Sequence, residues 1–553
     1  MRVRHTWFIV SLVFISILIF LLVLPMANVF IAGFTHPESG GFTFQNFRTI
    51  FTQIYPYKIA LNNSLFVGTI GAILPFIVAL PLAYLVSRYE FRSKTLLITV
   101  ISISMVMPAF IGAYFWVILL GRYGIITGPL NRLLGTSFSI YGQKAILWAF
   151  MWGRYPLVFL FLYPAFSTLN PEMEEAAQTL GANPKRTFLS ISLPMLVPAI
   201  VNAVYMSFIM CITDMGTPLV VGGDYLVLPT LMYQEFMTEV GSGRIPMAGA
   251  VGILLLLINV AVLFGGRYYI TRRRYEVVSA RRAEPKKLSG RRESAMIFGI
   301  WSVVGLGLLP WAFAIPGSFI EWGKGGRAFW NSPTLDNYRM VFTNPTLSRG
   351  VGVTLFLTVV SLTMMIVAGL LIAYILVKKR YLIINRALDI LVSLPLIIPG
   401  AVLALGYVMF FSSPPIILTG TWMILALCFF VRRLPHITRS IESTLYSISD
   451  AYEESSLNLG APPIKTFRKI TARMLMPGVV SGATLAFLFT MGTFSATIIL
   501  YTAPWTTLPI LIYQNTAVNT GIAAALSFVM LLIEFVPLLI VNRLTHGGIK
   551  IGV

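Results

Sequence analysis

The ionisable side chains inside long apolar stretches are the first candidates for chemistry in this sequence. Asp214 is followed by Met215-Gly216-Thr217-Pro218, and the matching stretch of the second half reads Met491-Gly492-Thr493. Arg154 and Arg433 also match, since each precedes a proline by two positions. A charged group inside a membrane is costly and often functional. These arginines therefore either pair with acidic residues and hold helix breaks or attract an anionic substrate, and the sequence leaves both interpretations open.

The sequence gives no sign of catalysis or of a resident metal. It contains neither an HExxH motif nor a GxxxxGK[ST] phosphate-binding loop, and its four histidines are scattered near span ends and loops. Cys211 and Cys428 both lie in apolar stretches, so no disulfide framework or CxxC motif is indicated. We therefore expect no catalytic residue, cofactor or metal in this chain.

The composition is that of a polytopic membrane protein. Of the 553 residues, 57% are hydrophobic and only 11% are charged, whereas about 25% are charged in soluble proteins. A net charge of +21 would also suit a nucleic-acid-binding protein. We exclude that class because the lysines and arginines lie between apolar runs, as the positive-inside rule requires.

The apolar runs predict an all-α integral membrane protein of about twelve spans. A helix of about 20 residues crosses a bilayer core of about 30 Å. The N-terminal run exceeds the apolar core of a signal peptide, about 7–15 residues, so we interpret it as a retained first span. The tenth run is the least regular, because Arg432, Arg433 and His436 interrupt it. The runs lie near residues 7–33, 60–87, 95–120, 145–168, 197–221, 245–270, 295–319, 350–377, 387–411, 421–445, 477–501 and 521–542.

The chain consists of two similar halves. Thr43–Arg48 matches Thr334–Arg339 at one place, and Leu228–Gln234 matches Leu508–Gln514 at another. We therefore predict two six-span repeats in parallel orientation, 1–270 and 295–553. The basic segment 271–294 is interpreted as a cytoplasmic linker, with a lipid-headgroup or regulatory role as the alternative. The distribution of Lys and Arg predicts that both termini are cytoplasmic.

A polar loop occurs in both halves, at about 170–194 and about 449–473. Asn170 and Asn183 are expected to cap helices in the first copy, and Ser449 or Asp450 in the second. Gly181 and Gly460 stand where a left-handed residue ends a helix. Each loop should therefore fold as helix, tight turn and helix. Its occurrence at equivalent places in both halves indicates a docking surface that is used twice.

The first copy resembles a known family signature. It reads Glu175-Ala176-Ala177, three residues, Gly181, nine residues, and then Ile191-Ser192-Leu193-Pro194. This pattern is similar to the loop of permease subunits in binding-protein-dependent ABC importers. The second copy departs from it, since Ser455-Ser456 replaces the two alanines and Ala472-Arg473 replaces Leu-Pro. Two fused six-span halves resemble the ferric-iron-type permeases.

The resemblance implies partners and site residues. Two copies of an ABC ATPase subunit, which bind ATP and Mg, would dock on coupling helices, and a periplasmic solute-binding protein would deliver the substrate. The multi-pass permease would lie in a bacterial inner membrane, in contact with lipid and not with nucleic acid. The implied coupling residues are Glu175, Ala176, Ala177, Gly181, Glu454, Ser455, Ser456 and Gly460. The implied residues along the substrate path are Asp214, Gly216, Thr217, Gly492 and Thr493.

Iron(III) is the substrate that the resemblance favours. Phosphonate, sugar-phosphate, thiamine and polyamine are the alternatives, because selectivity in such systems rests largely on the binding protein. A twelve-span secondary transporter and a non-transporting membrane scaffold or receptor are the alternative classes. Neither of them accounts for a duplicated docking loop.

Overall fold

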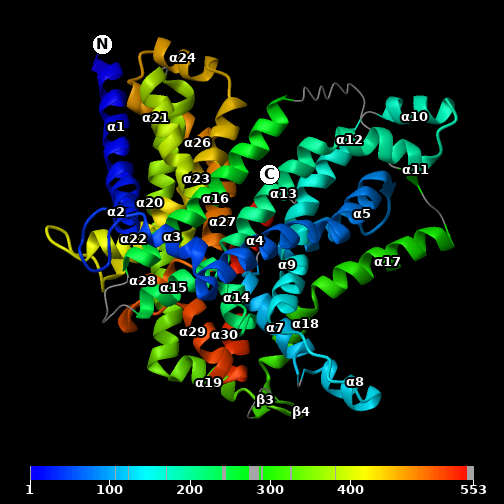
Figure 1. Ribbon diagram of the computed structural model, residues 1–553. Helices are drawn as coiled ribbons and strands as arrows, with labels where there is room; N and C mark the ends of the chain where they lie inside the picture. Colours follow the sequence, from blue (N-terminus) through cyan, green and yellow to red (C-terminus); the bar gives the residue numbers. More distant parts are fainter. Residues whose placement is uncertain are drawn as a thin grey trace. The chain divides into compact units, whose positions relative to one another are not determined.

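The structure of the chain is a computed structural model that is almost entirely helical (Figure 1). It describes residues 2–105, 107–122, 124–169, 171–238, 245–272, 286–287, 290–323, 327–379 and 381–544. Most of the predicted linker 271–294 lies outside these residues, and so does the predicted helix cap Asn170.

The secondary-structure elements follow in chain order, with short pieces of π- or 3₁₀-helix labelled η. The elements before the linker are α1 (Arg2–Leu18), η1 (Ile19–Val23), α2 (Leu24–Gly33), α3 (Gln45–Thr52), η2 (Ile54–Lys58), α4 (Ile59–Ile73), α5 (Pro75–Arg88), β1 (Tyr89–Glu90), α6 (Lys94–Ser104), α7 (Ala109–Leu120), α8 (Thr127–Leu134), α9 (Gln143–Ser167), α10 (Pro171–Thr179), α11 (Pro184–Thr187), η3 (Phe188–Ser192), α12 (Leu193–Met195), α13 (Val197–Ile212), α14 (Gly216–Val221), α15 (Leu228–Thr238) and α16 (Ile245–Arg272). The later elements are β2 (Lys286–Lys287), α17 (Arg291–Gly307), α18 (Leu309–Gly317), β3 (Ile320–Gly323), β4 (Arg327–Pro333), α19 (Asp336–Thr343), α20 (Pro345–Lys378), α21 (Leu382–Ser393), η4 (Leu394–Leu396), α22 (Gly400–Phe411), α23 (Trp422–Tyr446), α24 (Ala451–Asn458), α25 (Pro463–Thr466), η5 (Phe467–Thr471), α26 (Ala472–Met474), α27 (Met476–Met491), α28 (Thr497–Leu500), η6 (Ala503–Trp505), α29 (Leu508–Val518) and α30 (Thr520–Leu544).

Several of the predicted spans are bent or broken helices. Among the described residues, six helices are long and apolar enough to cross a membrane, and the number rises to eleven if each bent pair counts as one span. The tenth predicted run forms α23, an unbroken helix of 25 residues that carries five ionisable side chains, Arg432, Arg433, His436, Arg439 and Glu442. The predicted spans five and eleven end early, at Ile212 and Met491, and their last residues form the separate short helices α14 and α28.

Contacts between residues divide the chain into two compact units. Unit 1 comprises Met1–Arg48, Met232–Leu256 and Leu335–Gly552, and unit 2 comprises Thr49–Leu231, Leu257–Thr334 and Val553. Each unit thus contains residues from both predicted repeats. The repeats 1–270 and 295–553 describe the duplication in the sequence and stay a prediction.

Two small sheets interrupt the helical structure of unit 2. β1 pairs in parallel with β2, so the described part of the linker is hydrogen-bonded to the residues that follow α5. β3 and β4 form an antiparallel pair with an irregular register at Ile320. In Figure 1, α10 and α11 lie at the opposite end of unit 2 from α8, β3 and β4.

The core of unit 1 is built by α20, α23 and α27, which pack pairwise. Gly478 and Gly482 lie one turn apart on α27, at the small-xxx-small spacing that lets membrane helices approach closely. A Cβ atom on Gly482 would lie only 2.9 Å from the Cα of Ile437 on α23. The hydroxyl of Ser440 donates a hydrogen bond of 2.9 Å to the carbonyl of Gly478. The two helices are therefore in backbone contact.

In unit 2 the corresponding core is formed by α5, α9, α4 and α13. The face of α9 that meets α5 and α7 carries large aromatic side chains, which interlock in edge-to-face pairs. The ring centroids of Trp116 and Trp148 are 5.4 Å apart, and those of Trp152 and Tyr155 are 5.9 Å apart. This arrangement holds α9, and with it Arg154, in a fixed orientation.

The close contact between α23 and α27 predicts the effect of a larger side chain. Gly482→Ile should lower the free energy of unfolding by about 1–3 kcal/mol, because the added atoms overpack the contact. Thermal unfolding of the purified protein in detergent measures this change. Ala483→Ile, at the neighbouring and partly exposed position, is the matched control. Equal melting temperatures for the two variants would contradict the packing described here.

Candidate functional site

The two polar loops have the same backbone structure. In the first, α10 ends in a turn at Gly181, where φ is +86°; in the second, α24 ends at Gly460, where φ is +79°. The amide of Ala182 donates to the carbonyl of Ala177, and that of Ala461 donates to Ser456. The predicted left-handed glycines are thus confirmed, as is the helix–turn–helix structure.

The second helix of each loop also begins as expected. The side chain of Asn183 accepts a hydrogen bond of 2.8 Å from the amide of Arg186, so it caps α11. α25 begins at Pro463 after Pro462. At the start of α24, the hydroxyl of Ser449 accepts from the amide of Ala451 at 3.3 Å, while Asp450 makes no capping hydrogen bond and pairs instead with Lys378.

A carboxylate on the inner side of each short helix connects the loop to its unit. Glu174 accepts a hydrogen bond of 2.6 Å from the hydroxyl of Ser192 and forms an ion pair with Arg88 at the end of α5. At the matching position, Glu453 accepts from Thr471 at 2.6 Å and from the phenol of Tyr374 at 3.2 Å. Each carboxylate therefore links α10 or α24 to the π-helical turn η3 or η5 and to a long helix.

A phenylalanine in each loop inserts into a group of aromatic rings. The ring of Phe188 lies 5.4 Å from Tyr84 and 6.4 Å from Phe166. The ring of Phe467 lies 4.8 Å from Tyr374 and 5.6 Å from Trp7. Edge-to-face and stacked pairs at these separations add to the energy of burial.

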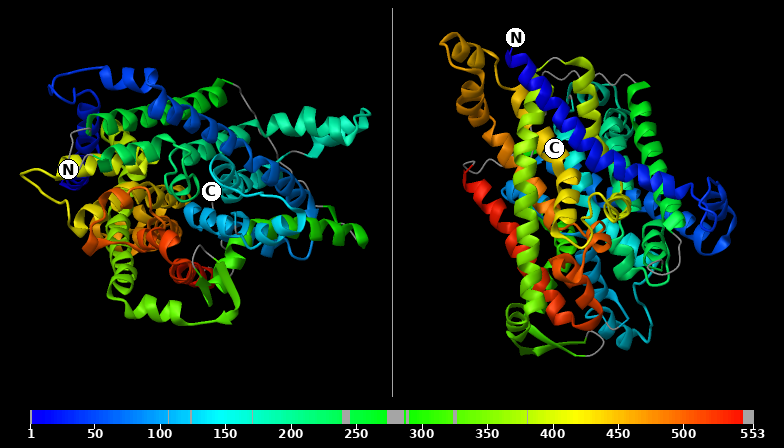
Figure 2. Two further views of the ribbon diagram at one scale, coloured as in Figure 1. Left: turned by 60° about the horizontal axis from the view of Figure 1, so that its bottom comes forward. Right: turned by 90° about the vertical axis from the view of Figure 1, so that its left-hand side faces the viewer.

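The environment of the second aromatic group is also charged. The ammonium of Lys379 lies 5.0 Å from the ring centroid of Tyr374. Burial lowers the pKa of Lys379, although the nearby Glu453 carboxylate acts in the opposite direction. In Figure 2 the start of α1 and the α24 loop lie at the same end of unit 1, in agreement with the contact between Trp7 and Phe467.

The outer surface of each loop is exposed and partly apolar. Leu180 and Leu459 occupy the matching position just before the left-handed glycine, and their exposed fractions are 89% and 88%. The predicted coupling residues divide between the two sides of the short helices. Ala177 and Ser456 are partly buried, whereas the exposed members are Glu175, Ala176, Gly181, Glu454, Ser455 and Gly460.

Sequence reasoning therefore chose the outward glutamates, Glu175 and Glu454, and missed their inward neighbours Glu174 and Glu453. It also missed the two exposed leucines. A signal was present, because Glu174 matches Glu453 and Leu180 matches Leu459 at the same internal positions of the repeat. The sequence does not indicate which face of each short helix packs against its unit.

Inside unit 2, the predicted path residues form one bonded group. Arg154 on α9 pairs with Asp214 across 3.0 Å. The other carboxylate oxygen of Asp214 accepts from the amide of Thr217 at 3.0 Å, so Asp214 caps α14. Gly216 and Thr217 are buried. The chain is interrupted at this place, since α13 ends at Ile212 and α14 begins at Gly216.

In the matching group of unit 1, no carboxylate pairs with Arg433 among the residues that the structure describes. Arg433 on α23 donates to the carbonyl of Phe489 at 3.0 Å and to the hydroxyl of Thr493 at 3.3 Å. Thr493 is buried, and Gly492 follows the last residue of α27, so a helix break is present here as well. The ion pair of the first half is thus replaced by hydrogen bonds from the guanidinium to uncharged oxygens.

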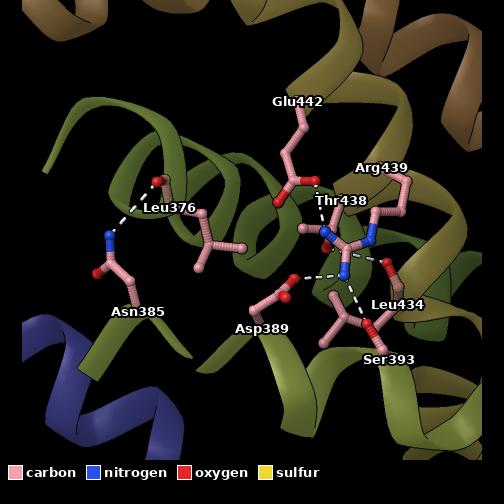
Figure 3. A network of polar contacts seen from close by, with 8 residues as sticks. All are labelled: Leu376, Asn385, Asp389, Ser393, Leu434, Thr438, Arg439 and Glu442. Carbon is pink, nitrogen blue, oxygen red and sulfur yellow. Dashed lines mark hydrogen bonds and ion pairs between the residues drawn. The ribbon is translucent and has the colours of Figure 1, made fainter. Parts of the chain in front are cut away.

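A second polar group in unit 1 lies nearer to the loop (Figure 3). Arg439 reaches Asp389 and Ser393 on α21, both at 2.5 Å, and Glu442 one turn later at 2.7 Å. Asp389 is thereby paired within the unit. This network joins α21 to α23.

Comparisons with known proteins identify the family. The model of the binding-protein-dependent transport system inner membrane component matches residues 71–275 and again residues 365–547. The chain is 30% identical, over 90% of its own length and 78% of the relative, to the putative ferric transport system permease protein FbpB 1 of Haemophilus influenzae. It is 29% identical, over 88% of its length and 71% of the relative, to the ferric transport system permease protein FbpB of Actinobacillus pleuropneumoniae.

Shorter relatives match part of the chain. The molybdenum transport system permease protein ModB of Haemophilus influenzae is 27% identical over 36% of this chain and 89% of its own length. The two family matches cover most of the sequence, and the long relatives match nearly all of it. The chain therefore belongs to the family of inner-membrane components of binding-protein-dependent transport systems, as the multi-pass permease subunit of an ABC importer.

Proposed function

We propose that the chain is the fused permease of an iron(III) importer and that its two polar loops are the docking sites for two copies of an ABC ATPase subunit. The observation that carries the docking proposal is the identical construction of the loops, from the left-handed glycine to the inner carboxylate. Two matching surfaces require two matching partners. In this arrangement the loops and both termini face the cytoplasm, and a periplasmic binding protein delivers the substrate to the other side.

The outward residues are suited to docking. Leu180 and Leu459 expose nearly their whole side chains, and burying an apolar side chain of this size contributes about 1.5–3 kcal/mol. Small neighbours, Ala176 and Ser455, let a partner surface approach the helix backbone. Glu175 and Glu454 add charge beside the apolar contact.

The inward residues are suited to transmission. Because Glu174 and Glu453 connect each short helix to long helices of its unit, a displacement of the loop moves those helices rather than the loop alone. In unit 2 the chain then leads through η3 and α12 into α13, which ends at the break beside Asp214. Asp214, Gly216, Thr217, Gly492 and Thr493 are accordingly proposed to lie along the path that opens and closes.

The cargo is assigned from the relatives. The two long relatives are named as ferric transport permeases and match about nine tenths of the chain. The molybdenum transport relative matches about a third of it, so iron(III) is favoured over an oxyanion of another metal.

The docking proposal predicts a loss of partner binding from single substitutions. Leu180→Asp and Leu459→Asp should each weaken co-purification of the ATPase subunit, and the double variant should abolish it, because a carboxylate cannot be buried in the apolar contact. Leu133→Asp is the matched control, since Leu133 is 83% exposed on α8, at the other end of unit 2. Full ATPase binding by the double variant would refute the assignment.

The transmission proposal predicts uncoupling without dissociation. Glu174→Gln should leave ATPase binding intact but reduce uptake by about tenfold or more, because the ion pair with Arg88 is lost and a charged hydrogen bond contributes about 1.5–3 kcal/mol. Uptake and ATPase activity are measured together in proteoliposomes. Glu172→Gln, on the exposed side of the same helix, serves as the control. Equal uptake in both variants would contradict the role of Glu174.

The iron assignment is tested by reconstitution. Proteoliposomes containing this chain, its ATPase subunits and its periplasmic binding protein should accumulate ⁵⁵Fe(III) only when ATP is present inside. Uptake of radiolabelled molybdate or thiamine under the same conditions provides the comparison. Accumulation of one of these in place of iron would overturn the assignment of the cargo while leaving the docking proposal intact.

A further inference from the structure

Arg432 is a charged residue in the middle of α23, a helix of unit 1. It is only partly buried, and within the part of the chain that the structure describes no hydrogen bond or ion pair reaches its guanidinium. At 1.5 Å per residue, it stands about 15 Å from the start of α23, a helix about 37 Å long. An arginine at that depth requires an anionic partner or a polar passage.

The guanidinium of Arg432 packs against a glycine. A Cβ atom on Gly400 would lie 1.6 Å from Nη1 of Arg432 and 2.1 Å from its Cζ, so the guanidinium occupies the space that any other residue at this position would fill. Gly400 is the first residue of α22, after Pro399. The N-terminus of a helix carries a partial positive charge and free amide donors. The arginine and the start of α22 therefore both favour an anion at this place.

Two further basic side chains lie beside Arg432 on α23. Arg433 donates only to neutral oxygens, the carbonyl of Phe489 and the hydroxyl of Thr493. The imidazole of His436 lies one turn later, with its ring centroid 5.0 Å from that of Phe489. The carboxylates of Asp389 and Glu442 are bonded to Arg439, further along the helix (Figure 3). The cluster of Arg432, Arg433 and His436 thus has no carboxylate that balances it among the described residues.

The first half lacks this cluster at the matching positions. Gly153 stands where the second half has Arg432, and Ala109, which follows Pro108 at the start of α7, stands where it has Gly400. Asp214 neutralises Arg154 there, whereas Thr493 takes the place of that carboxylate in the second half. The second half therefore has both the arginine and the glycine that leaves room for it, and the first half has neither.

We propose that the cluster of Arg432, Arg433 and His436 is a binding site for an oxyanion group of the cargo, with Arg432 as its principal ligand. This inference rests on the proposed function. It implies that iron(III) crosses as a complex whose phosphate or carboxylate ligands carry negative charge. Arg432 binds such oxygens through its planar donor pair. Among the described residues, no three His, Cys, Asp or Glu side chains gather closely enough to hold a bare metal ion.

The test measures anion binding directly. The full-length permease is placed in nanodiscs of phosphatidylcholine and equilibrated with ³²P-orthophosphate or with ⁵⁵Fe(III)-citrate. The wild-type protein should bind at least one probe, and Arg432→Gln should weaken that binding by about tenfold or more. Arg432→Lys should retain part of the affinity. Thr493→Asp, which gives the second half the carboxylate of the first, should weaken binding without removing any arginine.

The control is Arg349→Gln, which removes a charge from an exposed part of the same unit, where the guanidinium lies 5.9 Å from the ring of Trp505. It should bind both probes as the wild type does. Unchanged binding by Arg432→Gln, or no binding of either probe to the wild type, would overturn the proposal. So would loss of probe binding when phosphatidylglycerol is added to the nanodiscs, since a lipid phosphate would then be the occupant.

Uptake assays separate this inference from the assignment of iron. If the wild type accumulates ⁵⁵Fe(III) and Arg432→Gln does so equally well, the anion site is wrong and the iron assignment stands. If the wild type binds orthophosphate in an Arg432-dependent way but accumulates no iron, the anion site stands and the iron assignment is wrong.

Discussion

The cost of leaving a charged or hydrogen-bonding group without a partner in an apolar environment governs where polar residues stand in this protein. Asp214 meets this requirement by pairing with Arg154 and capping α14. Arg439 meets it by joining Asp389, Ser393 and Glu442. Each such group lies at a helix break or between two long helices. The polar contacts therefore determine where the helices are fixed to one another and where they are interrupted.

The same requirement applies to the two polar loops, which are connected to their units by bonded side chains. A nine-residue helix such as α10 has little stability by itself. Glu174 and Phe188 connect it to the unit by an ion pair, a hydrogen bond and aromatic contacts. Glu453 and Phe467 do the same in the second loop with different partners, Tyr374 and Thr471. The backbone construction is shared while the bonded partners differ, so the two loops have diverged in their contacts and kept the same backbone geometry.

Much of this was predictable from local sequence, because caps and turns depend on a few neighbouring residues. Gly181, Gly460 and Asn183 took the predicted conformations. The partners of Arg154 and Arg433 could not be chosen, since Asp214 and Thr493 lie about 60 residues away, in the breaks that follow α13 and α27. The grouping of α1 and α2 with the late helices of unit 1 likewise depends on contacts between distant segments that periodicity does not encode. The inward position of Glu174 was missed because Glu174 and Glu175 are neighbours on one short helix, and the sequence does not show which of the two side chains points toward the unit.

The contact between Gly400 and Arg432 couples these two positions. A side chain at 400 would displace the guanidinium, which lies at the end of a flexible side chain and can turn away. A change at 400 would therefore move the positive charge without removing it. A permease assembled from two identical subunits would carry such a pair twice, whereas fusion of the halves in one polypeptide allows it to occur in one half alone.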